Sequence, residues 1–320
     1  MIRMWTGLWT LALQELFAHG QNELIESNCD VQGMLQLKLQ PDIVKPETTT
    51  TEPAEASAAN LSNSSQPPLV TLMPTQALPA PVVNITTFHW EPHWQCAETD
   101  SACIAAALSK FKELVSESGA QIVGALELKG ASGALPGWSS SKEYEDAVSV
   151  MVAPGWQVLK EGGGHICCDG QRGLAVMLVK PPFQVSNCDT LCVMAVHPGH
   201  SPIQSGESIV KSVCGDATTS CAIAVGDWNV DAAGVVGGSF NTWQRLVGGN
   251  PPSFVVPDSE TCCYPSTCCK FDHVVTNIPG AEPLQVHVWP YQLLGQFGMD
   301  EEHMPVAVRF SAPAKTTLIG

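Results

Sequence analysis

The chain has 320 residues, of which 44% are hydrophobic and 14% are charged, a balance that excludes a disordered polyelectrolyte and a coiled coil. Its 15 Lys and Arg against 31 Asp and Glu give a formal net charge of -16, which argues against a protein that holds nucleic acid mainly by a basic surface. An enzyme acting on phosphodiesters stays open, because clustered carboxylates can hold a divalent cation that screens the substrate.

The first twenty residues have the features of a secretory signal peptide. Arg3 precedes an apolar stretch that ends at Leu13, and small residues follow at Ala18 and Gly20. An amphipathic N-terminal helix is the alternative, because polar residues follow the apolar stretch directly. No run in the chain approaches the roughly 18 consecutive apolar residues that span a bilayer. We therefore expect residues 1–20 to direct export and the chain to have no stable membrane span.

A segment of low complexity follows. Residues 21–45 make a short N-terminal segment, and residues 46–81 are rich in Thr, Ser, Ala and Pro without the apolar periodicity of a strand or a helix. Such a composition cannot bury enough apolar area to offset chain entropy, so these residues are predicted to be a linker. N-x-S/T triplets at Asn60 and Asn63, and at Asn84 beyond the linker, agree with a secreted glycoprotein.

The cysteines point to an oxidising compartment. The chain has 13 of them, including the adjacent pairs Cys167 and Cys168, Cys262 and Cys263, and Cys268 and Cys269. The last two pairs lie within TCCYPSTCC, which is too tightly spaced for a zinc finger with two separated pairs of ligands. Disulfides are therefore favoured over a metal site, and the secretory pathway over the cytosol. Because the number is odd, at least one thiol is left free or pairs between chains, and Cys29 is the candidate.

From residue 82 to residue 312 the sequence predicts a domain of mixed structure. Short, apolar, β-branched runs typical of strands lie at 82–88, 121–128, 147–153, 173–180, 190–197, 221–228, 271–277, 284–289 and 304–310. Apolar residues from Ile104 to Val115 recur near a helical period, which predicts an amphipathic helix that ends at Gly119. Shorter helices are expected at 209–215 and 240–249. The pattern indicates an α+β fold of two packed mixed β-sheets with flanking helices, followed by a tail at 313–320.

Chemically active side chains follow several of these runs. In chain order they are Glu127, His197, Asp227 and Asn229 within GDWN, Asp272, Glu302 and His303. Their order resembles that of the endonuclease/exonuclease/phosphatase superfamily, the deoxyribonuclease-I-like metal-dependent phosphoesterases. The resemblance covers residues 82–312, and it implies a four-layered α/β/β/α sandwich that hydrolyses phosphoesters with a divalent metal ion.

The resemblance assigns Glu127 to the metal ion and the GDWN motif to the phosphoryl group. Asp227 and Asn229 are two residues apart, so in a strand their side chains point the same way and can meet one phosphate. Asp227 would assist the metal or orient the nucleophile, and Asn229 would donate a hydrogen bond to a phosphoryl oxygen in the transition state. A polar turn is the alternative for this motif.

Two histidines complete the implied catalytic set. His197 leaves a strand before Pro198 and would hydrogen-bond the scissile phosphate. His303 would be the general base that takes a proton from water, while Asp272 accepts a hydrogen bond from its other ring nitrogen. We expect these side chains and those of the two preceding motifs to converge at one end of the domain.

Two residues depart from the pattern of the superfamily. Glu302 stands before His303 where the family has Asp, so a metal-binding carboxylate there reaches one methylene farther. His89 stands where the family has Asn, and an imidazole there would bind metal, contact phosphate when protonated, or mark reduced activity. Mg²⁺ is the expected ion, with Mn²⁺ or Zn²⁺ as alternatives. Glu91 and His93 could add ligands, although a loop position is the simpler expectation.

Three functions fit this sequence. The favoured one is a secreted phosphodiester hydrolase, expected to be a monomer, with an endonuclease preferred because no basic residue follows GDWN as it does in inositol-polyphosphate phosphatases. A sphingomyelinase or phosphoinositide phosphatase of the same fold is the alternative, because the core motifs indicate phosphoester hydrolysis and not the leaving group. A catalytically weakened, secreted binding module would explain His89 and Glu302. Nucleic acid or another phosphodiester is thus the expected partner.

Overall fold

The computed structural model describes residues 81–99, 101–166, 172–204, 206–264, 267–290, 294–297 and 302–315. Several sequence features lie outside the described residues, namely the signal peptide, the linker up to residue 80, Cys29, Cys167, Cys168 and residues 316–320 of the tail. Within the described part of the chain, no helix is both long and apolar enough to cross a membrane.

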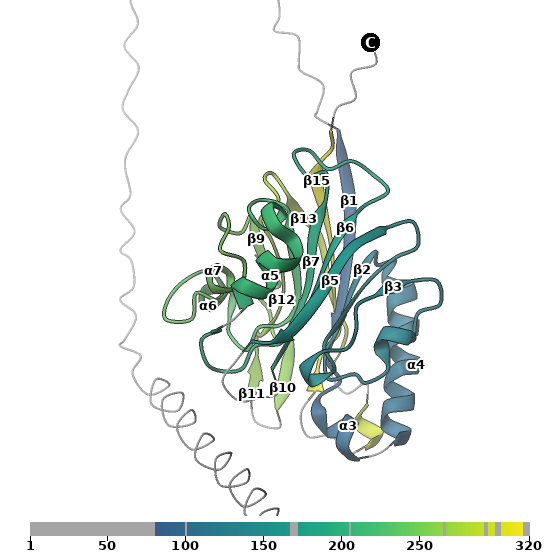
Figure 1. Ribbon diagram of the computed structural model, residues 1–320. Helices are drawn as coiled ribbons and strands as arrows, with labels where there is room; N and C mark the ends of the chain where they lie inside the picture. Colours follow the sequence, from purple (N-terminus) through teal and green to yellow (C-terminus); the bar gives the residue numbers. More distant parts are fainter. Residues whose placement is uncertain are drawn as a thin grey trace, which may run out of the picture.

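The first six-stranded sheet brings together the beginning and the end of the domain (Figure 1). Its strand order is β13-β15-β1-β2-β4-β3. The bounds are β1 Val82–Trp90, β2 Ile122–Ala125, β3 Ser139–Ser140, β4 Ser149–Val152, β13 Glu282–Val288 and β15 Val306–Pro313. β1 pairs parallel with β2 and antiparallel with β15, so the sheet is mixed.

The second six-stranded sheet has the order β5-β6-β7-β8-β12-β9. Its strands are β5 Gln157–His165, β6 Gly173–Lys180, β7 Leu191–Val196, β8 Ala222–Asp227, β9 Phe254–Val256 and β12 Asp272–Thr276. β7 and β8 are parallel and the other pairs are antiparallel. A small third sheet joins β10 Cys262–Tyr264 to β11 Thr267–Cys269 on one side and to β14 Glu302–His303 on the other.

Helices cover the outer faces of the two large sheets. They are α3 Trp94–Thr99, α4 Ser101–Ser118, α5 Gly206–Cys214, α6 Ala232–Val236 and α7 Thr242–Val247. Phe111 of α4 packs with Phe88 on the outer face of the first sheet, and Val210 of α5 and Trp243 of α7 pack on the second sheet. The predicted helices at 104–115, 209–215 and 240–249 therefore correspond to α4, α5 and α7.

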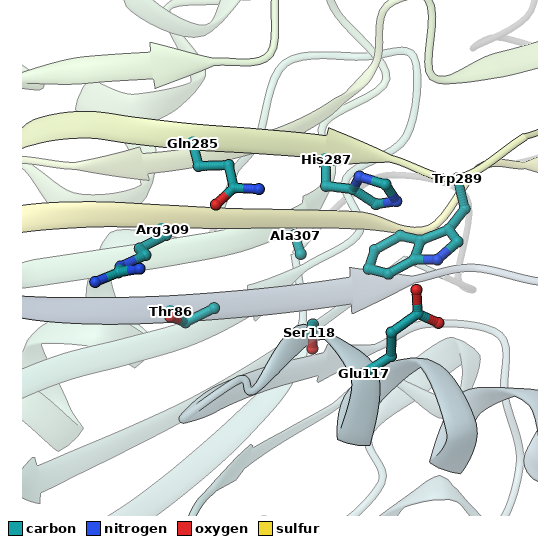
Figure 2. Close-up of a pocket in the computed structure, with 8 residues that line it drawn as sticks. All are labelled: Thr86, Glu117, Ser118, Gln285, His287, Trp289, Ala307 and Arg309. Atoms are coloured by element: carbon teal, nitrogen blue, oxygen red, sulfur yellow. The ribbon is translucent and has the colours of Figure 1, made fainter.

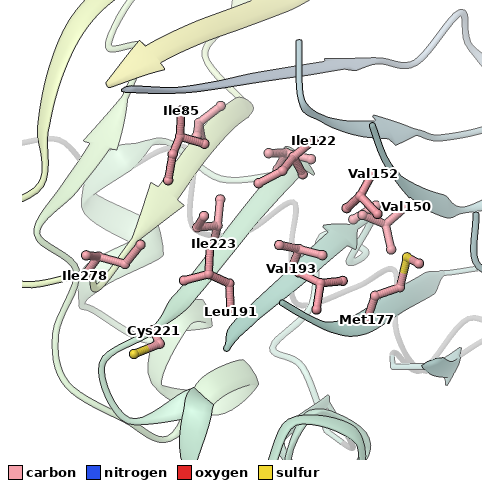
Figure 3. Close-up of a cluster of buried hydrophobic side chains, with 14 of the residues drawn as sticks. Ile85, Ile122, Val150, Val152, Met177, Leu191, Val193, Cys221, Ile223 and Ile278 are labelled. Carbon is pink, nitrogen blue, oxygen red and sulfur yellow. The ribbon is translucent and has the colours of Figure 1, made fainter. Parts of the chain in front are cut away.

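The largest apolar cluster lies between the sheets (Figure 3). Ile85 and Ile122 enter it from the first sheet, and Val193 and Ile223 enter it from the second. With helices outside each sheet, the chain forms the four-layered α/β/β/α sandwich, and the predicted fold class is confirmed.

Disulfides link the layers and brace the small sheet. The five bonds are Cys96–Cys103, Cys188–Cys221, Cys192–Cys214, Cys262–Cys269 and Cys263–Cys268. All ten cysteines in the described part of the chain are paired. The two bonds of TCCYPSTCC cross the β10–β11 hairpin, whose register sets Cys262 opposite Cys269 and Cys263 opposite Cys268. Disulfides, and not a zinc finger, are thus confirmed for this motif.

Candidate active site

The site lies at one end of the apolar core between the two sheets, where several of their strands end. Side chains alternate between the faces of a strand, and Val193 of β7 and Ile223 of β8 both point into the core between the sheets. Counting on by twos leads to His197 and Asp227, which are buried at the end of that core. Asp272 enters from the neighbouring strand, where it pairs in register with Asp227. Because side chains alternate along these strands, His197 and Asp227 lie at the same end of the core as Asp272.

The GDWN motif forms a tight turn at the end of β8. Gly226 has a φ of 141°, and a side chain there would collide with the carbonyl oxygen of Val196, so only glycine fits. Asp227 Oδ1 accepts a hydrogen bond from the Asn229 backbone N–H at 2.8 Å. The Asn229 amide donates to Asp227 Oδ2 at 2.9 Å and to the Pro198 carbonyl at 2.7 Å. Asn229 therefore fixes the carboxylate of Asp227 and ties it to the loop after His197.

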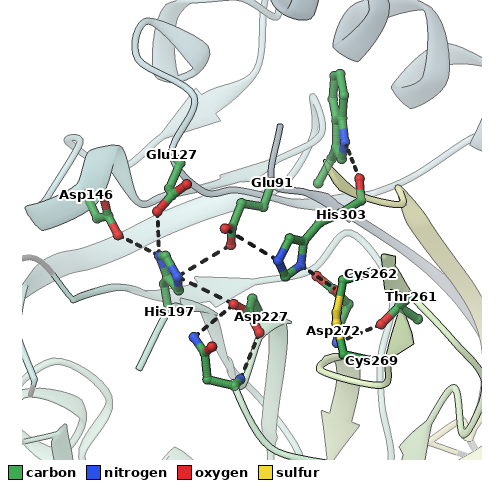
Figure 4. Close-up of polar contacts among 12 residues, drawn as sticks. Glu91, Glu127, Asp146, His197, Asp227, Thr261, Cys262, Cys269, Asp272 and His303 are labelled. Atoms are coloured by element: carbon green, nitrogen blue, oxygen red, sulfur yellow. Dashed lines mark hydrogen bonds and ion pairs between the residues drawn. A yellow bond between two sulfur atoms is a disulfide. The ribbon is translucent and has the colours of Figure 1, made fainter. Parts of the chain in front are cut away.

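His303 and Asp272 form a hydrogen-bonded pair (Figure 4). His303 Nδ1 lies 2.8 Å from Asp272 Oδ2, and both side chains are buried. The backbone N–H of Asp272 donates to Thr261 Oγ1 at 3.0 Å, and the Trp90 indole donates to the His303 carbonyl at 3.0 Å. Because Asp272 holds Nδ1, the Nε2 atom of His303 is directed to the rest of the site, 3.8 Å from Glu91 Oε1.

His197 lies among acids and one guanidinium. Its Nδ1 is 2.7 Å from Asp146 Oδ2 and 4.0 Å from Glu127 Oε1, while its Nε2 is 3.5 Å from Glu91 Oε2. Arg172 Nη1 lies 2.6 Å from the same Nε2 and within 3.4 Å of Glu127. A guanidinium only donates, so Nε2 can accept from Arg172 only when it carries no proton. Burial lowers the pKa of His197, but Glu91 and the hydrogen bond with Asp146 outweigh it and raise this pKa.

The structure gathers the predicted Glu127, His197, Asp227, Asn229, Asp272 and His303 through continuous contacts. It also places Glu91 at the centre of the site, a residue that the sequence offered as an additional ligand while favouring a loop position for it. Two further residues, Asp146 and Arg172, were not singled out from the sequence. Asp146 sits on a backbone with a positive φ of 62°, and Arg172 precedes β6. Neither of these two residues belongs to a recognisable motif.

The two departures from the family pattern lie at the edge of this cluster. His89 is fully buried, with Nε2 3.9 Å from Asp272 Oδ1 and no hydrogen bond from either ring nitrogen within the described residues. Burial lowers its pKa to about 4, so the ring is neutral near pH 7. Glu302 is also buried, and its Oε1 accepts a hydrogen bond from the Leu294 backbone N–H at 3.0 Å. For both residues, metal binding stays a prediction.

Burial and mutual repulsion disturb the acids of the site. Burial, together with the carboxylate of Glu91, raises the pKa of Glu127 to about 11, and burial raises the pKa of Asp227 to about 7. Burial lowers the pKa of His303, but the attraction of Asp272 and the other carboxylates outweighs it and holds this pKa well above its usual value. Without a cation, Glu127 therefore keeps its proton near neutral pH, because its carboxyl group is buried close to other carboxylates.

Two overlapping groups of side chains are suited to a divalent cation. One consists of Glu91, His197 and Asp227, and the other of Glu127, Asp146 and His197. In each group, one ligand atom per residue lies within 4.8 Å of the others. The buried Oε2 atoms of Glu91 and Glu127 have no hydrogen-bond partner within the described residues. Carboxylates suit Mg²⁺ and Mn²⁺ and imidazole suits Zn²⁺, so the residues present fit a divalent cation.

A pocket of about 410 Å³ on the outer face of the first sheet is separate from this site (Figure 2). Thr86 of β1 and Arg309 of β15 line it, together with His287 and Trp289. Thr86 points away from the core between the sheets, because Ile85 beside it points inward. None of the residues that line this pocket belongs to the catalytic cluster.

No protein-family model and no curated protein sequence matches this chain. A comparison with solved structures finds similar chains. TDP2 from D. rerio, complexed with a single-strand DNA product, is 15% identical with a TM-score of 0.45, and the match covers 71% of this chain and 98% of that one. An endonuclease/exonuclease/phosphatase from Bacteroides vulgatus is 12% identical with a TM-score of 0.45, over 71% and 98% of the two chains.

A third structure is that of ANGEL2, a 2′,3′-cyclic phosphatase in complex with adenosine-2′,3′-vanadate. It is 11% identical with a TM-score of 0.47, and the match covers 72% of this chain and 96% of that one. At such identities, function has to be argued from the side chains of this chain itself. By its four layers and by the order of its site residues, the chain resembles the endonuclease/exonuclease/phosphatase superfamily.

Proposed function

We propose that this chain is a divalent-metal-dependent phosphodiester hydrolase that acts on nucleic acid in the secretory pathway or outside the cell. The observation that carries the proposal is the convergence of the His303–Asp272 pair with a buried cluster of carboxylates. A hydrogen-bonded His–Asp pair moves protons, and a buried surplus of carboxylates accommodates a cation. Phosphodiester hydrolysis by water needs both functions in one place.

The residues divide the chemistry among them. Glu91, Glu127, Asp146, Asp227 and His197 would hold the cation, which when bound supplies positive charge that stabilises the phosphoryl oxygens in the transition state.

Proton transfer belongs to His303. Its Nε2 takes a proton from the attacking water, while Asp272 keeps the other ring nitrogen protonated and the ring in place. The guanidinium of Arg172 donates to Glu127 and Asp146, and it could instead donate to a phosphoryl oxygen of the substrate. After Asp272, the carboxylates of Glu91 and Asp227 raise the pKa of His303, and these two would also hold the cation, so their neutralisation by it favours the basic form of the ring.

Two observations support secretion and the choice of substrate. Five disulfides in the described residues suit an oxidising compartment. Val230, and not a basic residue, follows the GDWN motif, which separates this chain from the inositol-polyphosphate phosphatases of the same fold. Nucleic acid is therefore preferred over phosphoinositides as the substrate.

The test is a substrate panel with the purified full chain and Mg²⁺, Mn²⁺ or Zn²⁺. We expect cleavage of a single-stranded oligonucleotide and of bis-p-nitrophenyl phosphate, and loss of both activities in His303→Ala. Cleavage of sphingomyelin or a phosphoinositide, with the oligonucleotide left intact, would show that the substrate class is wrong. Absence of turnover on every substrate with every metal would support the binding module instead.

A further inference from the structure

Two ring side chains, those of His93 and Trp94, lie beside the proposed general base His303. The ring of His93 lies 6.5 Å from the ring of His303, and their planes are 12° apart. The ring of Trp94 lies 5.4 Å from that of His93. A positive φ of 74° at His93 turns the chain sharply between β1 and α3 and sets the two rings side by side. The ring of His93 thus lies between the indole of Trp94 and His303, the proposed general base.

Trp94 is exposed, although the helix that it begins is held firmly. Its side chain is 45% exposed, while Cys96, two residues further on, is buried and bonded to Cys103 of α4. The helix α3 lies at the same end of the molecule as the β10–β11 hairpin (Figure 1). A large indole kept open to solvent beside a reaction centre leaves apolar area uncovered, and a flat ligand group would cover it.

Position and isolation of this ring favour a nucleobase over a membrane. The other exposed large apolar side chains in the described residues lie on other elements: Val82 on β1, Leu159 on β5, Val236 on α6, and Leu284 and Val286 on β13. None of these is aromatic, and α3 contributes Trp94 alone. An exposed indole with no other large exposed apolar side chain on its helix is suited to stacking on one planar group, and less suited to entering a bilayer.

The charges of the site restrict the nucleic acid further. In the described part of the chain, the cluster holds five carboxyl groups, and Arg172 supplies the one guanidinium among its contacts. A chain with a formal net charge of -16 and so few basic side chains at its site has little to neutralise the phosphates of a long duplex. Stacking on an unpaired base supplies affinity that does not depend on many phosphate contacts.

We propose that Trp94 is a stacking platform for an unpaired nucleobase next to the scissile phosphate, which makes nucleotides and single-stranded nucleic acid the substrate class of this site. The inference rests on the proposed phosphodiester hydrolase function and specifies it. Trp94 is a specificity residue in this scheme, and the chemical step stays with His303 and the carboxylates.

Two chromogenic diesters test this inference with the full chain. Thymidine 5′-(p-nitrophenyl phosphate) and methyl p-nitrophenyl phosphate release the same leaving group, and only the first carries a base. We expect Trp94→Ala to raise KM about tenfold for the thymidine ester and to leave the methyl ester unchanged. Trp94→Phe should keep most of the affinity, because a phenyl ring also stacks. Val236→Ala, an exposed apolar residue on α6, is the matched control and should change neither ester.

Equal losses on both esters would show that Trp94 contacts the leaving group or supports the fold, and would overturn the inference. Unchanged KM values for both esters would overturn it as well, as would an effect of Trp94→Ala confined to sphingomyelin vesicles. If the wild-type chain hydrolyses neither ester, the proposed function fails. In that case, the dissociation constant of thymidine 5′-monophosphate tests the stacking role of Trp94 separately. Trp94→Ala should raise this constant about tenfold, and an unchanged constant would overturn the inference.

Discussion

At the scale of single residues, Glu91 organises the site. Its two carboxylate oxygens face different histidines, Oε2 at 3.5 Å from His197 Nε2 and Oε1 at 3.8 Å from His303 Nε2. Glu91 therefore lies between His197, proposed as a ligand of the cation, and His303, proposed as the general base. A cation bound by Glu91 is adjacent to both, which is where charge develops during attack on phosphorus.

The proton and the cation are assigned to different residues, and this division is testable. His303→Ala should lower kcat about 100-fold or more at saturating Mg²⁺, because a general base contributes that much. Glu127→Gln should instead raise the Mg²⁺ concentration needed for half-maximal rate. Since burial and Glu91 keep metal-free Glu127 protonated, Gln matches its shape and should leave the free energy of unfolding unchanged. A rescue of His303→Ala by added Mg²⁺, but not of Glu127→Gln, would reverse the two assignments.

His89 should make the fold sensitive to acid. Its pKa is about 4 in the folded chain because of burial, and about 6.5 in the unfolded chain, so the unfolded state binds the extra proton between these values. The stabilising contribution is complete above pH 6.5 and is lost as the pH falls toward 4. Between pH 7.5 and 5.5 this residue should cost about 1 kcal/mol of unfolding free energy.

Denaturant unfolding at the two pH values measures this loss. Both lie above the sequence pI of about 4.8, which limits association. His89→Asn should remove about 1 kcal/mol of the pH dependence, whereas the exposed His287→Gln on β13 should leave it as in the wild type. An identical pH dependence in wild type and His89→Asn would contradict the assignment.

At the scale of elements, the β10–β11 hairpin supports the general base. β14 pairs with β10 in a register that sets His303 opposite Cys262 and Glu302 opposite Cys263. Each of these cysteines is bonded across the hairpin to its partner on β11. His303 is thus positioned by a strand of two residues that depends on a disulfide-braced neighbour.

Replacing the inner bond of the hairpin by Cys263→Ser with Cys268→Ser should lower the free energy of unfolding by about 2 kcal/mol, as expected for a short closed loop. Hydrolysis should fall as well, because the support of β14 is weakened. The same double substitution at Cys188 and Cys221, far along the chain from His303, is the control: it should cost stability without a comparable loss in kcat. Equal effects of the two double variants on kcat would argue against a positioning role for the hairpin.

The count of free thiols checks the disulfide framework of the exported chain. Thirteen cysteines less the ten in five disulfides leave at most three free thiols, and these can only be Cys29, Cys167 and Cys168. Thiol titration under denaturing conditions should therefore find three or fewer per chain. A value clearly above three would show that some of the five bonds are absent.

The elements that the sequence predicts best are those with a strong apolar pattern. α4 and the central strands β6, β7 and β8 follow such patterns and lie at the predicted positions. β5 was missed because its KEGGGH segment is mostly polar or glycine, and Gly163 is needed there since a side chain would collide with Tyr144. β10, β11 and β14 have only two or three residues each, too few for any periodicity.

The candidate site was predictable to the extent that its residues end buried strands. His197 and Asp227 follow apolar runs, so the alternation of side chains carries them to the site. Asp146 could not be found in this way, because it reaches His197 from a turn whose shape depends on tertiary contacts. Arg172 has no local pattern either, and its role follows only from the acids around it.

At the scale of the whole molecule, the polar residues of the site come from both large sheets. They lie at or just after the ends of strands and meet in one buried cluster. The first sheet supplies His89 and leads into Glu91, and the second supplies Asp227 and Asp272 and leads into His197. The stability of the sandwich therefore comes from the apolar core between the sheets, while the chemistry lies at the rim of that core. An acidic molecule can act on an anionic diester in this arrangement only when a cation offsets the carboxylates.

The most direct test of this account is the hydrolysis of bis-p-nitrophenyl phosphate by the full chain before chelation, after removal of metal with EDTA, and after addition of Mg²⁺ or Mn²⁺. The account predicts that chelation abolishes turnover, that one of these ions restores it in the wild type, and that neither restores it in His303→Ala. Turnover that survives chelation, or turnover by His303→Ala equal to that of the wild type, would contradict the account.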